Sequence, residues 1–289
     1  MEKPVIRISV RNLVEFILRN GDLESGGTAG DKEAMLKGSR LHRKIQKQMG
    51  SHYQAEVSLK KDTEYEDLIL RVEGRADGIF TQNEKICIDE IKGVYKNLEL
   101  LAEPVLVHRA QALCYAWIYL DDHGLEEIDV QMTYAHLDTE KIKRFRETMT
   151  REELESWYQR LLDSYHKWLS YQMKWREERN RSMEKLEFPF TYRKGQKEMV
   201  AGIYHAISRK EQIFIQAPTG VGKTMSAVFP AVRSIGEGKA ETLFYLTART
   251  ITRTVAQDAF EILRKNGLLF KTVTITAKEK LCFCEKPEC

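Results

Sequence analysis

The sequence predicts two α/β domains, the second of them built on a parallel sheet. Its 289 residues exceed the roughly 150 that one domain usually holds. Helical and strand patterns are grouped in residues 1–176, whereas helices and strands alternate in residues 188–289, as in a parallel sheet with crossover helices. A stretch that is almost wholly charged or polar, residues 177–187, separates the two patterns and is predicted to be a linker.

The composition is that of a globular protein. Hydrophobic residues make up 42% of the chain and charged residues 31%, which excludes a disordered, collagenous or low-complexity protein. No apolar run approaches the ~18 residues of a membrane helix, and the N-terminus lacks the apolar core of a signal peptide, so we expect a cytoplasmic protein without a membrane partner. Residues 188–289 hold 16 basic and 9 acidic residues, which fits a polyanionic partner or simply a solvated surface.

The first domain is predicted to begin with two helices. Ser9 precedes an apolar pattern of helical spacing that stops at Asn20 and Gly21, and a second helical pattern ends at Gly50. Strand-like segments around a polar turn at 81–84 then predict a hairpin, followed by a helix and another strand. The expected helices are 9–20, 32–49 and 106–120, and the expected strands are 54–60, 68–80, 85–91 and 128–136.

A long helix is predicted from residue 151 to about 175. Thr150 and Glu153 form a capping box, and apolar residues then recur at i, i+3 and i+4 spacing. Beyond the linker, three helical patterns alternate with three short apolar segments. The expected helices are 193–208, 223–236 and 250–266, and the expected strands are 211–216, 242–246 and 271–275.

A glycine-rich loop, residues 217–224 (APTGVGKT), joins the first of these apolar strands to its helix. Gly220 and Gly222 allow the backbone to curl so that its N–H groups face phosphate oxygens. Lys223 adds a positive charge near the outer phosphates, and Thr224 offers a hydroxyl to Mg²⁺. The loop therefore predicts a phosphate-binding site; the alternative is a chance glycine-rich turn.

This loop resembles motif I of superfamily 2 helicases. Upstream, residues 190–196 (FTYRKGQ) resemble the Q motif of these helicases, which implies that Gln196 bonds the adenine edge. Residues 246–250 (LTART) lie where the family carries motif Ia, a contact to the DNA backbone; the alternative is an ordinary strand and helix cap. The resemblance implies ATP with Mg²⁺, held by Gln196, Gly220, Val221, Gly222, Lys223 and Thr224.

Three cysteines crowd the end of the chain. Residues 280–282 (KLC) resemble the start of the iron-sulfur insertion of XPD/DinG-like helicases, which unwind DNA from 5′ to 3′. Soft thiolates suit iron, and four of them normally hold a [4Fe-4S] cluster. The resemblance implies a cluster completed by residues beyond 289, with Cys282 as the favoured ligand, then Cys289, then Cys284; zinc or unliganded thiols are the alternatives.

The helicase resemblance covers only the beginning of a motor. No Asp-Glu-Ala-His-type motif and no second motor domain occur in the 289 residues, although a motor needs a carboxylate for Mg²⁺ and a base for water. We therefore expect the chain to be the N-terminal part of a longer helicase and not to unwind DNA by itself.

Two acids and a lysine meet on the predicted hairpin. Its strands bring Asp77 alongside Glu90 and Lys92, which share a face because they are two residues apart, while Asp89 points the other way. A lysine beside two acids suits hydrolysis of phosphodiesters, in which the acids hold Mg²⁺ or Mn²⁺ and the lysine orients the attacking water. Taken singly, Asp77 also fits a turn residue, and Glu90 with Lys92 a solvated strand face.

This hairpin resembles the active site of PD-(D/E)XK nucleases, closely that of their RecB-like branch. Residues 38–42 (GSRLH) look like the helical motif of that family, which implies that His42 is a metal ligand; the alternative is a surface histidine. Gln111 and Tyr115, one helical turn apart, match the Gln-x-x-x-Tyr motif, which implies that they steady the site or touch DNA. The catalytic set that the resemblance implies is Asp77, Glu90, Lys92, Gln111 and Tyr115.

These predictions combine into one hypothesis. Residues 1–176 form a RecB-like nuclease domain, and residues 188–289 form the first part of a RecA-like helicase domain, with residues 177–187 between them. Together they act on DNA that is single-stranded or has single-stranded ends, in repair or processing. The alternatives are a nuclease fold without chemistry that binds DNA and loads the motor, and an unrelated P-loop ATPase.

Overall fold

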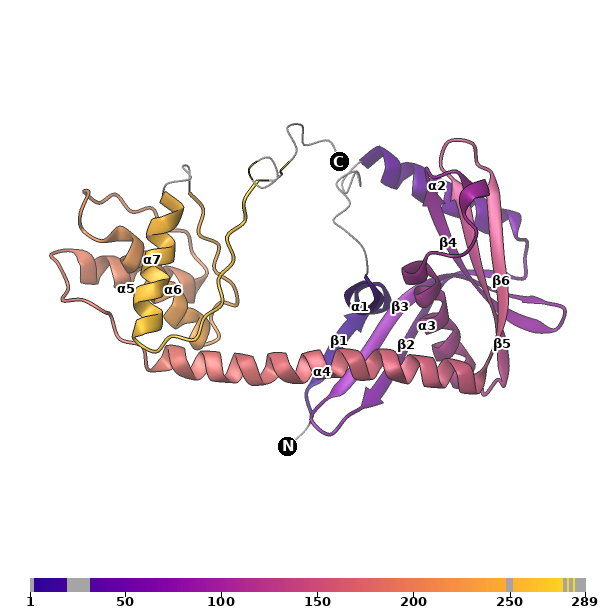
Figure 1. Cartoon of the computed structure of the whole chain (residues 1–289), viewed down its shortest axis with the longest axis horizontal. Coiled ribbons are helices and arrows are strands. Elements are labelled where there is room, and N and C mark those ends of the chain that lie inside the picture. Colours follow the sequence, from indigo (N-terminus) through magenta and orange to yellow (C-terminus); the bar gives the residue numbers. More distant parts are fainter. Residues whose placement is uncertain (1–2, 20–31, 248–251, 278–279, 281–282, 284–289) are drawn as a thin grey trace. The chain divides into compact units, whose positions relative to one another are not determined.

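The computed structural model describes residues 3–19, 32–247, 252–277, 280 and 283. These fall into two compact units, Met1–Leu169 and Ser170–Glu288 (Figure 1). The fold is mixed α/β, as predicted. The first unit contains a six-stranded sheet with parallel and antiparallel pairs, whereas the regular elements among the described residues of the second unit are helices.

Six strands form the sheet of the first unit. They are β1 (Val5–Ser9), β2 (Tyr53–Glu64), β3 (Ile69–Gln82), β4 (Lys85–Val94), β5 (Glu127–His136) and β6 (Ile142–Thr150). Their order is β1-β3-β4-β5-β6, and β2 pairs with β3 as well. The β1–β3 and β4–β5 pairs are parallel, and the other pairs are antiparallel.

β3 changes its partner along one edge. Its first residues, 69–73, pair with β1, and its last residues, 78–82, pair with β4. Residues 74–76, between these two ladders, pair only with β2 on the other edge. Asp77 therefore lies where one partner strand has ended and the next begins.

Helices accompany this sheet. They are α1 (Val10–Leu18), α2 (Lys32–Gln48), α3 (Leu106–Asp122) and the beginning of α4 (Arg151–Glu184), with a short 3-10 helix at Leu98–Leu100. α3 packs against β4, β5 and α1 (Figure 1). The first turns of α4 bury Leu154 and Tyr158, and the Tyr158 ring lies 6.1 Å from Trp117 of α3.

Every helix and strand predicted in the first 176 residues is present, with shifted ends, but β1 and β6 were not predicted. β6 alternates between exposed and half-buried residues and is rich in charge, so it lacks the apolar face that identifies a strand. β1 has only five residues. Pairing with β3 and β5 stabilises these two strands more than their own sequences do.

Most of the predicted linker at 177–187 is helical, because α4 continues to Glu184. Arg, Glu and Lys residues have high helix propensity, and the absence of an apolar pattern does not end a helix. Arg181 also pairs with Glu177, one turn away, at 2.6 Å.

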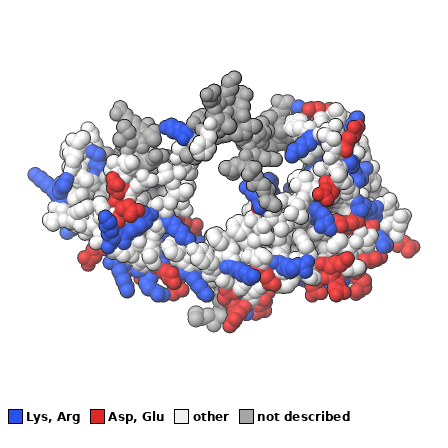
Figure 2. Space-filling model, viewed as in Figure 1, with Lys and Arg blue, Asp and Glu red and all other residues white. Residues whose placement is uncertain are grey.

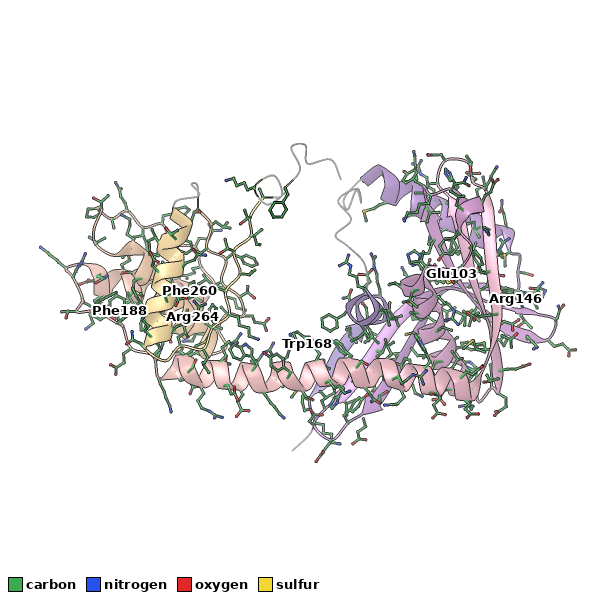
Figure 3. The ribbon with its side chains drawn as sticks, in the orientation of Figure 1. Glu103, Arg146, Trp168, Phe188, Phe260 and Arg264 are labelled. Carbon is green, nitrogen blue, oxygen red and sulfur yellow. The ribbon has the colours of Figure 1, made fainter. Side chains whose placement is uncertain are left out.

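The second unit contains α5 (Gln196–Arg209), α6 (Lys223–Gly236) and α7 (Thr252–Lys265), close to the predicted ranges. Their apolar residues form one buried cluster, which includes Val228, Val232 and Leu263. Figure 3 labels Phe260 and Arg264 on α7: Phe260 stacks on Phe270 with ring centroids 5.4 Å apart, and Arg264 donates hydrogen bonds of 3.2 and 3.0 Å to the Phe270 carbonyl oxygen.

The strands expected at 211–216, 242–246 and 271–275 are not observed: in the described part of the second unit these segments form no strand pairs. A parallel strand is stable where its edges are paired and both of its faces are covered. Here several large apolar side chains stay at least 85% exposed, namely Phe214, Leu246, Val273 and Ile275. An apolar pattern alone therefore did not produce a sheet.

The surface carries charge of both signs. On the face shown in Figure 2, Lys and Arg side chains lie among Asp and Glu side chains on each unit. None of the helices in the described ranges is both long and apolar enough to cross a membrane.

Candidate metal and nucleotide sites

Asp77 is held by the main chain of the neighbouring strand. Its Oδ2 atom accepts a hydrogen bond of 2.7 Å from the backbone N–H of Ile91 on β4. The β3–β4 ladder ends with the pair Gly78 and Asp89, so the carboxylate binds an N–H group that no longer has a strand partner on this edge. This arrangement fixes the Asp77 side chain, which is only 17% exposed.

Glu90 is the most buried acid of the predicted site. Its Oε1 atom accepts a hydrogen bond of 2.7 Å from Lys92 Nζ, whereas its Oε2 atom is buried and has no hydrogen-bond partner among the described residues. Burial raises the pKa of Glu90 to about 7 against the lowering effect of Lys92, and the negative charge of Asp77 adds to the rise. One oxygen of Glu90 therefore lacks compensation for its burial.

His42 reaches the same place from α2. Its Nδ1 atom lies 3.6 Å from Asp77 Oδ1. Buried Leu41 and Ile45, on the same helix, pack against Ile91 of β4 and so hold α2 on the sheet. The prediction that His42 and Asp77 come together is thus consistent with the structure.

The two acids and the imidazole do not form a ready three-ligand centre. Among the residues that the structure describes, no group of three or more His, Cys, Asp or Glu side chains is placed to hold a metal ion. His42 approaches Asp77, and both Asp77 and His42 act electrostatically on Glu90, so the three side chains are near one another without forming such a group.

α3 brings Gln111 and Tyr115 into the same region. A Cβ atom on Gly74 would lie 2.7 Å from the Tyr115 hydroxyl, so glycine is needed where this ring meets β3. Burial raises the pKa of Tyr115, and the charge of Glu90 raises it further. Gln111 is 4% exposed, and its Oε1 atom, like Glu90 Oε2, is buried without a partner in the described part of the chain.

Asp89 lies on the opposite face of β4, as strand alternation predicts. It is fully buried and accepts hydrogen bonds from Thr133 Oγ1 at 2.6 Å, Tyr53 Oη at 3.1 Å and Gln131 Nε2 at 3.2 Å. Because its carboxylate is satisfied by neighbouring strands, Asp89 supports the sheet beneath the site.

The glycine-rich loop has the backbone that phosphate binding needs. Gly220 and Gly222 have φ values of +83° and +78°, in the left-handed region that glycine adopts without strain. Gly222 is the N-cap of α6, and Lys223 is its first residue. The positive end of the α6 dipole therefore faces the loop.

Lys223 and Thr224 are tied to nearby residues. Lys223 Nζ donates hydrogen bonds of 2.9 Å to the carbonyl oxygens of Ala217 and Pro218, so its ammonium group lies over the loop. Thr224 Oγ1 accepts a bond of 3.4 Å from the Tyr245 hydroxyl. Both side chains lie at the N-terminus of α6, as predicted.

Gln196 is bonded directly to this loop. Its Oε1 atom accepts from the Arg193 backbone N–H at 3.0 Å, and its Nε2 atom donates to the Val221 carbonyl oxygen at 3.1 Å. Arg193 donates a further bond to the Gly220 carbonyl oxygen. A Cβ atom on Gly222 would lie 2.7 Å from Gln196 Nε2, so the glycine gives the amide room. The adenine contact of Gln196 stays a prediction.

The nucleotide loop and Gln196 lie within a segment that matches a known family. Residues 193–282 match the family model described as DEAD/DEAH box helicase. The match supports the assignment of this segment to a superfamily 2 helicase. It supports a helicase-type nucleotide-binding function for these residues, with ATP and Mg²⁺ as the suggested ligand and nucleic acid as the implied partner.

No curated protein matches the chain. Among solved structures, the crystal structure of SSO0001 is similar, with a TM-score of 0.35 and 20% identity over 50% of this chain and 67% of that chain.

Some predicted site residues lie outside the described part, and some contacts were not predicted. Cys282, Cys284 and Cys289 belong to residues that the structure does not describe. Gln46 bonds the Asp77 carbonyl oxygen, and Arg193 bonds the nucleotide loop, but neither contact was predicted from the sequence. For Gln46 the available signal was its spacing of four residues from His42, and for Arg193 it was its place in the FTYRKGQ segment.

Proposed function

We propose that the chain joins a metal-dependent DNA nuclease of the RecB-like PD-(D/E)XK type to the beginning of an XPD/DinG-like DNA helicase. The observation that carries the nuclease proposal is the group formed by Asp77, Glu90 and Lys92. One acid is held by a strand N–H, and the other is buried beside a lysine with one oxygen unsatisfied. Structural acids are normally satisfied by hydrogen bonds, as Asp89 is on the opposite face.

The donor set suits Mg²⁺ or Mn²⁺. Both ions prefer carboxylate oxygens, and the buried Oε2 atom of Glu90 is the atom that gains most from a cation. Asp77, Glu90 and His42 would hold the ion, with His42 next to Asp77. When bound, such an ion stabilises charge on the phosphate and makes water more acidic.

The remaining residues act through position and charge. Lys92 offsets part of the negative charge and orients the attacking water. Tyr115 packs against β3 at Gly74, three residues before Asp77, and Gln111 offers an amide that steadies the site or contacts DNA. These three side chains come from β4 and α3, which are regular elements.

On the helicase side, ATP with Mg²⁺ would occupy the loop at the start of α6. Gly220, Val221 and Gly222 would bind phosphate through the main chain. Lys223 would exchange its bonds to loop carbonyl oxygens for bonds to phosphate, Thr224 would bind Mg²⁺, and Gln196 would recognise adenine. The finer assignment, a 5′ to 3′ motor with a [4Fe-4S] cluster at Cys282, Cys289 and Cys284, rests on the sequence resemblance.

The substrate under this proposal is DNA that is single-stranded or has single-stranded ends, processed in the cytoplasm during DNA repair. One observation favours a second function, a DNA-binding platform that loads the helicase without cutting. That observation is the lack of a ready three-ligand metal centre among the described residues. The match of residues 193–282 to helicases argues against an unrelated P-loop ATPase.

A cleavage assay tests the proposal. The full chain is incubated with end-labelled single-stranded DNA and Mn²⁺, and is compared with Asp77→Asn and with Asp138→Asn, an exposed acid paired with Lys37. We expect cleavage by the wild type and by Asp138→Asn, and its loss in Asp77→Asn. DNA binding without cleavage by any of the three proteins would identify the platform instead.

A further inference from the structure

We infer that Gln46 is a positioning residue for the metal site: its amide fixes the main chain at Asp77 and so keeps His42 beside the Asp77 carboxylate. This inference rests on the proposed nuclease function and adds a residue outside the set that the sequence predicted. Gln46 lies on α2 and is 9% exposed.

Both contacts of the Gln46 amide are specific. Its Nε2 atom donates one hydrogen bond of 3.0 Å to the carbonyl oxygen of Asp77 and another of 3.1 Å to Glu56 Oε1. An amide nitrogen has two hydrogens, so these two bonds use its full donor capacity. A carboxylate at this position could not replace either bond.

Consecutive turns of α2 both contact Asp77. His42 and Gln46 are four residues apart and therefore lie on one face of the helix. His42 Nδ1 lies 3.6 Å from the Asp77 carboxylate, while Gln46 bonds the Asp77 carbonyl oxygen. The bond made by Gln46 thus sets how closely His42 approaches Asp77.

Glu56 ties this contact to the next strand. It lies on β2 opposite Asp77, between the pairs Ala55–Gly78 and Val57–Ala76. Its φ of +57° is in the left-handed region, which is uncommon for a residue other than glycine and persists only where the surroundings hold it. Gln46 is one such restraint, and Arg75, whose Nε atom is 2.6 Å from Glu56 Oε2, is another.

The test uses the full chain and Mn²⁺ as the probe. Gln46→Glu keeps the size of the side chain, removes the donor to Asp77 and places a negative charge against Glu56. Residues that orient metal ligands typically change metal affinity by about 10- to 100-fold when they are mutated. We expect that loss in Mn²⁺ affinity, measured by electron paramagnetic resonance without DNA, with Gln48→Glu, an exposed residue of the same helix, near the wild type.

A double-mutant cycle shows whether Gln46 acts through His42. In a His42→Ala background, Gln46→Glu should cause little further loss of Mn²⁺ affinity, because the ligand that it positions is gone. If the double mutant loses Mn²⁺ affinity by the product of the two single-mutant factors, the residues act independently and the inference is overturned. If Gln46→Glu does not fold, Gln46→Met, which is uncharged and of similar length, carries the same expectation.

Different results would overturn the role of Gln46 and the proposed nuclease function. Wild-type Mn²⁺ affinity in a folded Gln46→Glu protein would overturn the role of Gln46 and leave the nuclease proposal standing. A wild-type chain that binds no Mn²⁺ and cuts no DNA would overturn the nuclease proposal, and with it the role of Gln46.

Discussion

Lys92 Nζ lies 2.7 Å from Glu90 Oε1, while the other oxygen of Glu90 is buried with no hydrogen-bond partner in the described part of the chain. The lysine compensates only one side of an acid that also feels the negative charge of Asp77. Burial, partly opposed by Lys92, raises the pKa of Glu90 to about 7. Under the proposed function a divalent cation supplies the missing positive charge.

Glu90 should make the metal-free protein less stable as the pH rises. Its pKa is about 7 in the folded chain against an ordinary value of 4.5, so the folded state keeps a proton that the unfolded state releases. This stabilisation is present below pH 4.5 and is lost as the pH rises through 7. The free energy of unfolding of the wild type, measured in urea with EDTA and compared with that of Glu90→Gln, should therefore fall by on the order of 3 kcal/mol between pH 4.5 and pH 7. Identical pH profiles for the two proteins would contradict this.

Mn²⁺ binding should depend on the same proton. The ion binds the ionised carboxylate, so binding below pH 7 must displace the proton from Glu90. The affinity should rise about tenfold per pH unit up to that pH and level off above it. Calorimetry in buffers of different ionisation enthalpy measures the released proton directly. An affinity that stays flat over this range would argue against Glu90 as a ligand.

Lys223→Ala should weaken ATP binding. The loss of a charge-assisted hydrogen bond to phosphate corresponds to about 10- to 100-fold in affinity. Lys197→Ala, which removes an exposed lysine from the neighbouring α5, is the control. Titration with a fluorescent ATP analogue compares the two proteins. Equal affinities would remove Lys223 from the nucleotide site.

Two glycine substitutions should have opposite effects on stability. A Cβ atom on Gly78 would lie 1.8 Å from Tyr53 Cζ, and Tyr53 is held by its bond to Asp89, so Gly78→Ala should cost about 1–3 kcal/mol. Gly38 lies within α2 with nothing within 4 Å of its Cβ position, so Gly38→Ala should stabilise by about 0.5–1 kcal/mol. Thermal unfolding measures both. If Gly78→Ala unfolds at the same midpoint temperature as the wild type, Tyr53 is not fixed as described.

Local patterns predicted the first unit well where one face of an element is apolar. The start of α4 has that property, whereas residues 87–91 of β4 and 110–118 of α3 are buried throughout. β6 was not predicted because its exposed positions are charged and its inward positions are only half-buried. In the second unit the apolar segments were taken as strands, but pairing depends on neighbours that a local pattern does not contain.

The residues of the site were likewise predicted where local spacing alone places them. The two-residue spacing of Glu90 and Lys92 placed them on one face of β4, and their hydrogen bond agrees with this prediction. Gln46 and Glu56 were not predicted because their roles depend on how α2 and β2 meet at Asp77. Such contacts depend on how separate elements pack against one another, and local spacing does not predict them.

The most direct test of the metal site is an anomalous diffraction map from crystals grown with Mn²⁺. We predict one peak within coordination distance of the Asp77 and Glu90 carboxylates, with His42 as a third protein ligand and Lys92 still beside Glu90. A map without a peak at these acids, from crystals of a protein that cuts DNA with Mn²⁺, would contradict the proposed site and place the nuclease chemistry elsewhere.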